Sequence, residues 1–173
     1  MVNATGKNVV TTSKGLVRFL RNSLNSRPPN IELDLNGCAI WEQDVSNMDF
    51  GSANLEMVDV ESSDLRGVNF SGANLFRAYI DYSNLTGTDF SNANVKDASF
   101  VGLQASNSKW ERTAWWRAKR ISPDLLKYLQ DNYKFSPSVS YRDDMTKDFS
   151  EYHQEVERLT KFNSSTSGKP GSN

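Results

Sequence analysis

Large apolar residues recur at every fifth position through the middle of the chain, and this period restricts the fold more than any other feature of the sequence. Each of 14 consecutive multiples of five is large and apolar: Leu35, Ile40, Val45, Phe50, Leu55, Val60, Leu65, Phe70, Leu75, Ile80, Leu85, Phe90, Val95 and Phe100. The residue two positions earlier is mostly small or apolar, and the residue between them is usually Asp or Asn, as in Ala73, Asn74 and Leu75. A pattern this regular is an internal repeat, so the fold must place every five-residue unit in an equivalent environment.

Neither a helix nor a straight strand has a period of five residues. Five helical steps of about 100° leave successive apolar residues roughly 140° apart, so no apolar stripe forms. In a strand, an odd spacing sends them alternately to opposite faces. A chain that turns a corner every five residues instead points them all inward. Gly or Asn, which tolerate positive φ, recur at the expected corners: Gly37, Asn47, Gly67, Gly72, Gly87, Asn92 and Gly102.

The repeats resemble those of the pentapeptide-repeat family, whose A(D/N)LXX unit is matched by ANLEM, SDLRG, ANLFR, SNLTG and ANVKD. The resemblance covers residues 31 to about 118. It implies a β-solenoid, namely a right-handed quadrilateral β-helix with four pentads per coil and about four coils. At the roughly 4.8 Å spacing of neighbouring strands, such a rod is about 20 Å long.

Four pentads per coil predict that residues twenty positions apart stack on neighbouring coils. The predicted core then has one aromatic column and three mainly aliphatic ones: Phe50, Phe70, Phe90 and Trp110; Leu35, Leu55, Leu75 and Val95; Val45, Leu65 and Leu85; and Ile40, Val60, Ile80 and Phe100. The segregation of Phe onto one side supports the twenty-residue coil independently of the family resemblance.

An open solenoid exposes unpaired backbone and apolar core at both ends, so we expect helical caps at both ends. Residues 1–30 contain a basic amphipathic helix over 12–25, with Leu16, Phe19 and Leu20 on one face. We expect this helix to cap the first coil. A basic helix lying on a membrane surface is the alternative, although its short apolar face would bind lipid weakly.

Residues 119–162 are expected to supply the C-terminal cap. A helix start is indicated by Ser122 as N-cap and Pro123 at the first helical position. Its apolar face is predicted to pack on three tryptophans, Trp110, Trp115 and Trp116, and consists of Leu125, Leu126, Leu129 and Tyr133.

A further amphipathic helix is predicted over residues 143–162. Its apolar seam follows spacings of four and three residues: Met145, Phe149, Tyr152, Val156 and Leu159. A seam this short does not make a stable coiled coil alone, so we expect it to dock on its own rod, on a second copy in a homodimer, or on a partner. Residues 163–173 are polar and are predicted to form a disordered tail.

The sequence offers little material for catalysis. Cys38 is the only cysteine and His153 the only histidine, which excludes an internal disulfide and a zinc site built from these residues. We expect Cys38 to fill the core and His153 to be solvated. Stacked carboxylates such as Glu61 and Asp81 follow from the repeat itself, and a filled rod leaves no room for an active-site pocket. We therefore predict a protein that is not an enzyme and binds no cofactor.

No apolar run approaches the roughly 18 residues of a membrane helix, and no signal-peptide core is present near the N-terminus. The sequence therefore predicts a cytoplasmic protein that does not bind membranes.

An acidic middle lies between basic ends. Residues 31–100 carry 12 acidic and 3 basic side chains, whereas residues 1–30 carry five basic and no acidic ones. Members of the pentapeptide-repeat family include gyrase-binding proteins whose acidic rods resemble duplex DNA, so the resemblance implies DNA mimicry as one function. Nine net charges over roughly 17 Å give a density close to that of DNA. The rod spans only about five base pairs, however, and the basic ends oppose its field.

Outward positions of the repeat are usually polar, and the exceptions mark the predicted partner-binding site. Its residues are Trp41, Met57, Phe76, Arg77, Tyr79 and Tyr82. With a twenty-residue coil, Met57 lies one rung from Arg77, so these residues surround one side and corner of the rod. Clusters of exposed aromatic side chains usually become buried when another segment of the chain or another molecule packs on them. Either the 143–162 helix covers this patch, with Phe149 and Tyr152 facing it, or another molecule does.

These features predict a non-enzymatic scaffold that mediates protein–protein interaction through the outer faces of the rod and its helical extensions. It is expected to bind no nucleic acid directly. The alternative is an acidic DNA-mimicking protein that binds DNA gyrase or another DNA-binding protein.

Overall fold

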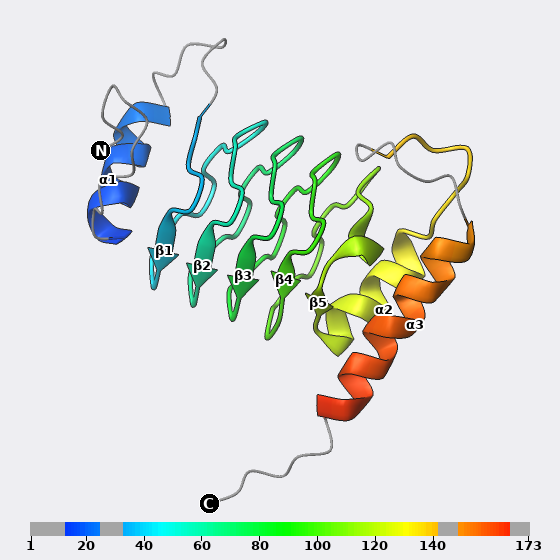
Figure 1. The fold of residues 1–173 in the computed structure, drawn as a ribbon. Coiled ribbons are helices and arrows are strands. Elements are labelled where there is room, and N and C mark those ends of the chain that lie inside the picture. The colour runs from blue at the N-terminus through cyan, green and yellow to red at the C-terminus, as the bar shows by residue number, and fades with distance from the viewer. Residues whose placement is uncertain (1–12, 25–32, 142–148, 167–173) are drawn as a thin grey trace, which may run out of the picture.

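The structure is a computed structural model that describes residues 13–24, 33–141 and 149–166 of the 173-residue chain (Figure 1). The elements in chain order are α1 (Ser13–Leu24), β1 (Ala39–Trp41), β2 (Asp59–Glu61), β3 (Tyr79–Asp81), β4 (Ser99–Phe100), the 3-10 helix η1 (Trp115–Arg117), β5 (Arg120–Ile121), α2 (Pro123–Asn132) and α3 (Phe149–Thr166). Figure 1 shows the coils stacked side by side, with α1 at one end of the stack and α2 and α3 at the other.

The stack is a four-sided parallel solenoid with twenty residues per coil. Strands β1 to β5 form one side and pair in parallel in chain order, with Ile40 opposite Val60 and Val60 opposite Ile80. Three further ladders of parallel bridges define the other sides, and their first pairs are Asp34 with Asn54, Asp44 with Asp64, and Asp49 with Asn69. Every one of these pairs is separated by twenty residues, which confirms the predicted coil length.

The corners adopt left-handed backbone whatever residue occupies them. Every fifth residue from 37 to 112 has positive φ, and 11 of these residues are not glycine. The predicted Gly and Asn corners are all among them, but so are Met57, Arg77 and Tyr82. The amides of these three corners each donate to a carbonyl of the next coil, at 2.8–3.0 Å. The ladder between coils therefore imposes the corner conformation against the preference of bulky side chains.

The predicted core is confirmed. All fourteen apolar multiples of five from 35 to 100 are buried, with at most 3% of any side chain exposed. The rings of Phe50, Phe70, Phe90 and Trp110 stack in one column with centroid separations of 5.6, 5.3 and 4.3 Å. Leu55, Leu65, Leu75 and Leu85 are likewise buried in the aliphatic columns.

The last coil departs from the predicted period. Ser99 pairs with Arg120 and Phe100 with Ile121, so this coil contains one residue more than the others, and its strand lies past the predicted end of the repeat at 118. The amide of Asn92 still follows the regular pattern by donating to Glu111, whereas the amide of Asp97 donates to Arg117. The additional residue is thus accommodated at η1, where Trp115 and Trp116 turn into the core and are buried.

Helix α1 packs against the first coil. Leu16 and Leu20, both on the predicted apolar face, join the buried core together with Val17. Arg21 anchors the helix by donating from Nη2 to the carbonyl oxygen of Asp44 at 2.6 Å. The Phe19 side chain lies outside the described residues.

Helix α2 covers the last coil. Three leucines of its predicted apolar face are buried, namely Leu125, Leu126 and Leu129. Ser122 occupies the N-cap position, but its hydroxyl makes no capping hydrogen bond. At the other end of α2, the indole Nε1 of Trp115 donates to the carbonyl oxygen of Tyr133 at 2.7 Å.

Helix α3 docks on the C-terminal end of its own rod, alongside α2 (Figure 1). Leu159 is fully buried, and the ring of Tyr152 meets those of Trp115 and Trp116 edge to face at 5.9 and 5.2 Å. Arg158 donates to the carbonyl oxygens of Ala118 and Lys119 at 2.5 and 2.9 Å.

Of the two alternatives for the exposed patch, the one in which this helix covers it, with Phe149 and Tyr152 facing it, therefore does not hold. Its Tyr152 ring instead packs on the buried tryptophans at the end of the rod. Residues 163–166 also continue α3, although they were predicted to be disordered. The hydroxyls of Ser164 and Ser165 donate to the Thr160 and Phe162 carbonyl oxygens within the last turns of α3. Residues 143–148 and 167–173 lie outside the described part of the chain.

Candidate partner-binding face

The strands β1 to β5 present two outward columns of side chains, and we call this side of the rod the sheet face. One column runs along the strand starts: Ala39, Asp59, Tyr79, Ser99 and Arg120, of which Ser99 is buried. The other runs along the strand ends, with Trp41, Glu61 and Asp81 on successive rungs. The sheet face thus combines large aromatic and acidic side chains, whereas the inward column of each strand is apolar.

The predicted site residues lie on the sheet face and at its two corners. Trp41 and Tyr79 project from strands with 50% and 42% exposure, and Tyr82, at the following corner, is 61% exposed. Met57 occupies the preceding corner with 46% exposure, one rung from Arg77, and its amide donates to the Phe76 carbonyl oxygen at 2.9 Å. The structure therefore brings Met57, Phe76 and Arg77 together but places Tyr82 at the far corner.

At the corner formed by Phe76 and Arg77, the side chains already interact with other residues of the chain. The Arg77 guanidinium lies over the Phe76 ring at 4.7 Å and within 3.9 Å of the Asp97 carboxylate. Phe76 is half-buried, whereas Arg77 is exposed. The predicted cluster is consequently not one continuous apolar patch, because acidic residues of the strands separate its two corners.

A groove of about 270 Å³ lies on the sheet face and is lined by Asp59, Glu61, Tyr79, Asp81 and Tyr82. The register places Glu61 beside Asp81, which confirms that this pair is stacked one coil apart. Asp59 was not singled out from the sequence, although it occupies the same phase of the coil as Tyr79. Comparing residues twenty positions apart on the outer surface, as was done for the core, would have found it.

The three carboxylates of this groove differ in their surroundings. Asp81 accepts hydrogen bonds from the Ser99 hydroxyl at 2.8 Å and the Val101 amide at 2.9 Å, and it pairs with Arg120 at 3.6 Å. The carboxylates of Asp59 and Glu61 make no hydrogen bond or ion pair with the part of the chain that the structure describes. Asp81 is therefore a structural group, whereas the other two present charge to the groove.

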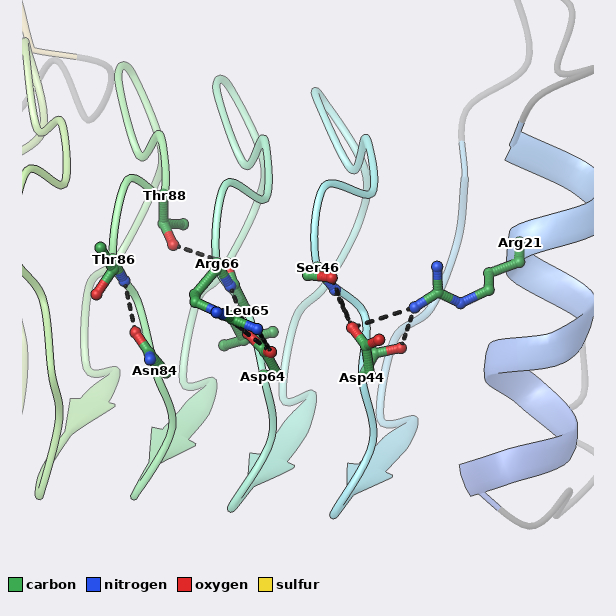
Figure 2. Close-up of polar contacts among 9 residues, drawn as sticks. All are labelled: Arg21, Asp44, Ser46, Asp64, Leu65, Arg66, Asn84, Thr86 and Thr88. Atoms are coloured by element: carbon green, nitrogen blue, oxygen red, sulfur yellow. Dashed lines mark hydrogen bonds and ion pairs between the residues drawn. The ribbon is translucent and has the colours of Figure 1, made fainter.

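On another side of the rod, the Asp and Asn positions serve the turns (Figure 2). Asp44, Asp64 and Asn84 lie on successive coils, and each side-chain oxygen accepts the amide two residues later. Hydrogen bonds from Ser46, together with the charge of Arg21, lower the pKa of the Asp44 carboxyl. A side-chain hydrogen bond from Arg66 likewise lowers the pKa of Asp64. Such acidic residues belong to the architecture of the repeat rather than to a free anionic surface.

Asparagine side chains also link the coils. The amides of Asn54, Asn74 and Asn94 each donate to the side-chain oxygen one coil earlier, at 3.0–3.2 Å, beginning at Asp34. Each of these hydrogen bonds holds two adjacent coils in register. These hydrogen bonds therefore keep the backbone of the sheet face fixed, although they lie on other sides of the rod.

No metal centre or membrane span is found in the described residues. Among them, no group of three or more His, Cys, Asp or Glu side chains is placed to hold a metal ion. The helices that the structure describes are too short or too polar to cross a bilayer. Cys38 is half-buried against the core, and this burial raises the pKa of its thiol. His153 is exposed on α3 beside the ring of Tyr152.

The repeat geometry agrees with a comparison against protein-family models. The model for pentapeptide repeats matches in eight copies, within residues 34–72, 46–79 and 73–109. The chain is a pentapeptide-repeat protein. The right-handed quadrilateral β-helix of this family accounts for the four ladders and the twenty-residue coil described above.

Several solved structures are similar to this pentapeptide-repeat protein. Rfr23 from the cyanobacterium Cyanothece 51142 is 25% identical, with a TM-score of 0.32 over 45% of this chain and 56% of that one. The protein alr5209 from Nostoc Pcc 7120 is 19% identical, with a TM-score of 0.41 over 68% of this chain and 86% of that one. QnrB1, a plasmid-mediated fluoroquinolone resistance protein, is 16% identical, with a TM-score of 0.31 over 73% and 70%.

This chain thus spans little more than half the length of the Rfr23 structure. Among the curated proteins, none matches it.

Proposed function

We propose that this pentapeptide-repeat protein is a non-enzymatic scaffold that binds a protein partner through the sheet face and its two corners. The proposal is supported by one observation above others. Large side chains that a soluble rod would normally bury, Trp41, Tyr79 and Tyr82, are 42–61% exposed together on one side of the rod. Helix α3, the segment of this chain that was one alternative for covering them, packs elsewhere.

The rigidity of the solenoid favours binding through this face. Tyr79 is held by a strand that pairs on both sides, and Tyr82 by a corner whose amide donates to the Val101 carbonyl oxygen at 2.8 Å. Aromatic side chains on fixed backbone lose little conformational entropy on binding and are common among the residues that dominate interfaces. The family is generally non-catalytic, in keeping with a binding role.

The DNA-mimic alternative receives less support from the charge distribution. Five acidic side chains of the coils are neutralised by cations, including three from outside the acidic segment: Asp44 by Arg21, Asp64 by Arg66, Asp81 by Arg120, Asp89 by Lys109 and Asp97 by Arg77. The basic flanks thus lie on the rod and reduce its negative potential. A DNA mimic would inhibit a topoisomerase, and no inhibition at high micromolar protein would exclude it.

Site-specific photocrosslinking tests the scaffold proposal. A photoreactive phenylalanine analogue replaces Tyr79 or Tyr82, and a control protein carries it at Ser106, which is exposed on another side of the rod. In lysate of the source organism, the sheet-face positions are expected to form a defined adduct that the Ser106 position does not form. Equal labelling from all three positions, or no adduct from either tyrosine position, would contradict the proposal.

A substitution experiment complements the crosslinking. Phe76→Ala combined with Tyr79→Ala is the less suitable variant, because Phe76 is half-buried and its removal also disturbs packing. Tyr79→Ala combined with Tyr82→Ala removes two exposed rings, and each surface change is expected to alter the free energy of unfolding by about 0.5 kcal/mol or less. Loss of co-purification of the crosslinked partner with this variant, with an unchanged unfolding midpoint, is the expected result.

A further inference from the structure

The groove on the sheet face combines negative charge with aromatic walls. Asp59 and Glu61 occupy alternate positions of β2, so both point outward, about 6.6 Å apart along the strand. Tyr79 stands on the next rung beside Asp59, and Tyr82 closes the far corner. Carboxylates beside the faces of tyrosine rings form a favourable environment for an organic cation.

Next to the groove on the sheet face, a side chain of the protein itself, Arg120, already occupies a comparable cation position. The guanidinium of Arg120 lies 5.9 Å from the centre of the Tyr79 ring and 3.6 Å from the Asp81 carboxylate. Arg120 thus already makes a cation–π contact with one tyrosine and an ion pair with one carboxylate of this face. On the other side of Tyr79, Asp59 and Glu61 repeat the arrangement, and no cation from the described residues pairs with them.

The cation at the corner before β3, Arg77, is paired outside the groove. Arg77 lies over Phe76 and next to Asp97. The groove volume of about 270 Å³ is also below the roughly 300–1,000 Å³ of sites for small-molecule ligands. It is therefore suited to a single long side chain rather than to a metabolite.

We propose that the groove formed by Asp59, Glu61, Tyr79, Asp81 and Tyr82 binds a lysine or arginine side chain that a protein partner presents from an extended segment. This inference rests on the proposed scaffold function and states the chemistry that its partner must have. The ammonium or guanidinium lies between the carboxylates of Asp59 and Glu61, and the Tyr79 and Tyr82 rings flank its aliphatic stem. An acidic segment is rejected because the same carboxylates repel it.

A peptide panel tests this assignment directly. The probe is the acetylated and amidated peptide GTSKSTG, and its variants carry arginine, norleucine or glutamate in place of the lysine. Binding to the full chain is followed by NMR titration of the tyrosine ring signals. The lysine and arginine peptides are expected to give saturable shifts of the Tyr79 and Tyr82 signals, at least about fivefold tighter than the norleucine peptide.

Two matched variants separate the groove from overall charge. Glu61→Gln removes one charge inside the groove, whereas Glu56→Gln makes the same change outside it, at the corner before β2. Glu61→Gln is expected to weaken the lysine peptide about two- to fivefold, and its combination with Asp59→Asn about tenfold. Glu56→Gln is expected to leave the affinity unchanged. Amide spectra of each variant establish that the fold is retained.

Three results would overturn the inference: equal affinity of the norleucine and lysine peptides, equal effects of the two Gln variants, or no saturable shift at about ten millimolar peptide. The crosslinking experiment separates these failures from failure of the scaffold proposal. A sheet-face adduct without lysine binding means that the face binds a partner by other chemistry. Lysine binding without an adduct retains the cation site and removes the proposed scaffold function.

Discussion

The stacked aromatic column makes a quantitative prediction about how neighbouring coils support one another. Phe70 and Phe90 are buried on adjacent coils, with ring centroids 5.3 Å apart and an angle of 24° between the planes. We consider Phe70→Leu, Phe90→Leu and the double variant. Each single change keeps an apolar side chain but removes the ring, and should lower the free energy of unfolding by about 1–3 kcal/mol, less than the roughly 3–5 kcal/mol of truncation to alanine.

The coupling between the two rings is the informative quantity. A stacked aromatic pair contributes about 0.5–1.5 kcal/mol beyond its buried area, so the double variant should lose that much less than the sum of the single variants. Phe50 and Phe90 belong to the same column but are separated by Phe70, which stacks on both. Their double-mutant cycle is therefore expected to be additive within about 0.5 kcal/mol.

Guanidinium unfolding followed by far-ultraviolet circular dichroism measures both cycles. Circular dichroism is preferable to fluorescence, because Trp110 stacks on Phe90 at 4.3 Å and its emission would respond to the substitution itself. If the Phe50 and Phe90 cycle shows coupling as large as that of the adjacent pair, stability is not transmitted from ring to ring. The reasoning from the column would then be refuted.

Three further substitutions test the C-terminal cap and the groove. Arg158→Ala leaves two carbonyl oxygens without their charged donor and should destabilise the docking of α3 by about 1–3 kcal/mol, seen as faster amide exchange within α3. Burial, together with the neighbouring Tyr128 side chain, raises the pKa of Tyr133 from 10.0 to about 12, so the folded state favours the neutral phenol. The associated stability is present below pH 10 and is lost as the pH rises to about 12. Tyr133→Phe should therefore flatten the alkaline fall in the free energy of unfolding, measured by urea titration. Gly102→Ala, at φ +68° with the added methyl overlapping the Tyr82 ring, should cost about 1–2 kcal/mol in thermal unfolding and shift the Tyr82 ring signals.

Much of the solenoid could be predicted because its environments repeat. Once Phe50 is inside, the coil places Phe70 and Phe90 inside for the same reason, and the sequence shows both the period and the segregation of the rings. The irregular last coil could not be predicted in this way. Its additional residue depends on how Trp115 and Trp116 enter the core at η1, which is a matter of packing against α2 and α3.

The candidate site was predicted in part. Exposure of Trp41, Met57, Tyr79 and Tyr82 follows from their phase in the repeat, and the structure agrees. Their separation into two corners does not follow from phase, because it depends on which turn each residue occupies. Asp59 was overlooked because Asp is so frequent in the repeat that one more drew no attention, although its carboxylate serves no turn.

The sequence by itself determined the five-residue turn, the twenty-residue coil, the buried columns and the outward phase of the exposed aromatics, because each depends only on local spacing repeated many times. Only the tertiary structure decided where α3 docks. An amphipathic pattern predicts that a helix buries one side, but it does not identify the surface on which that side packs. The tertiary structure also decided which carboxylates are paired with cations, because Arg21, Lys109 and Arg120 lie outside the acidic segment 31–100 and reach it only in the folded chain. The net charge of a segment therefore does not give its surface potential, because the potential depends on which charges folding brings together.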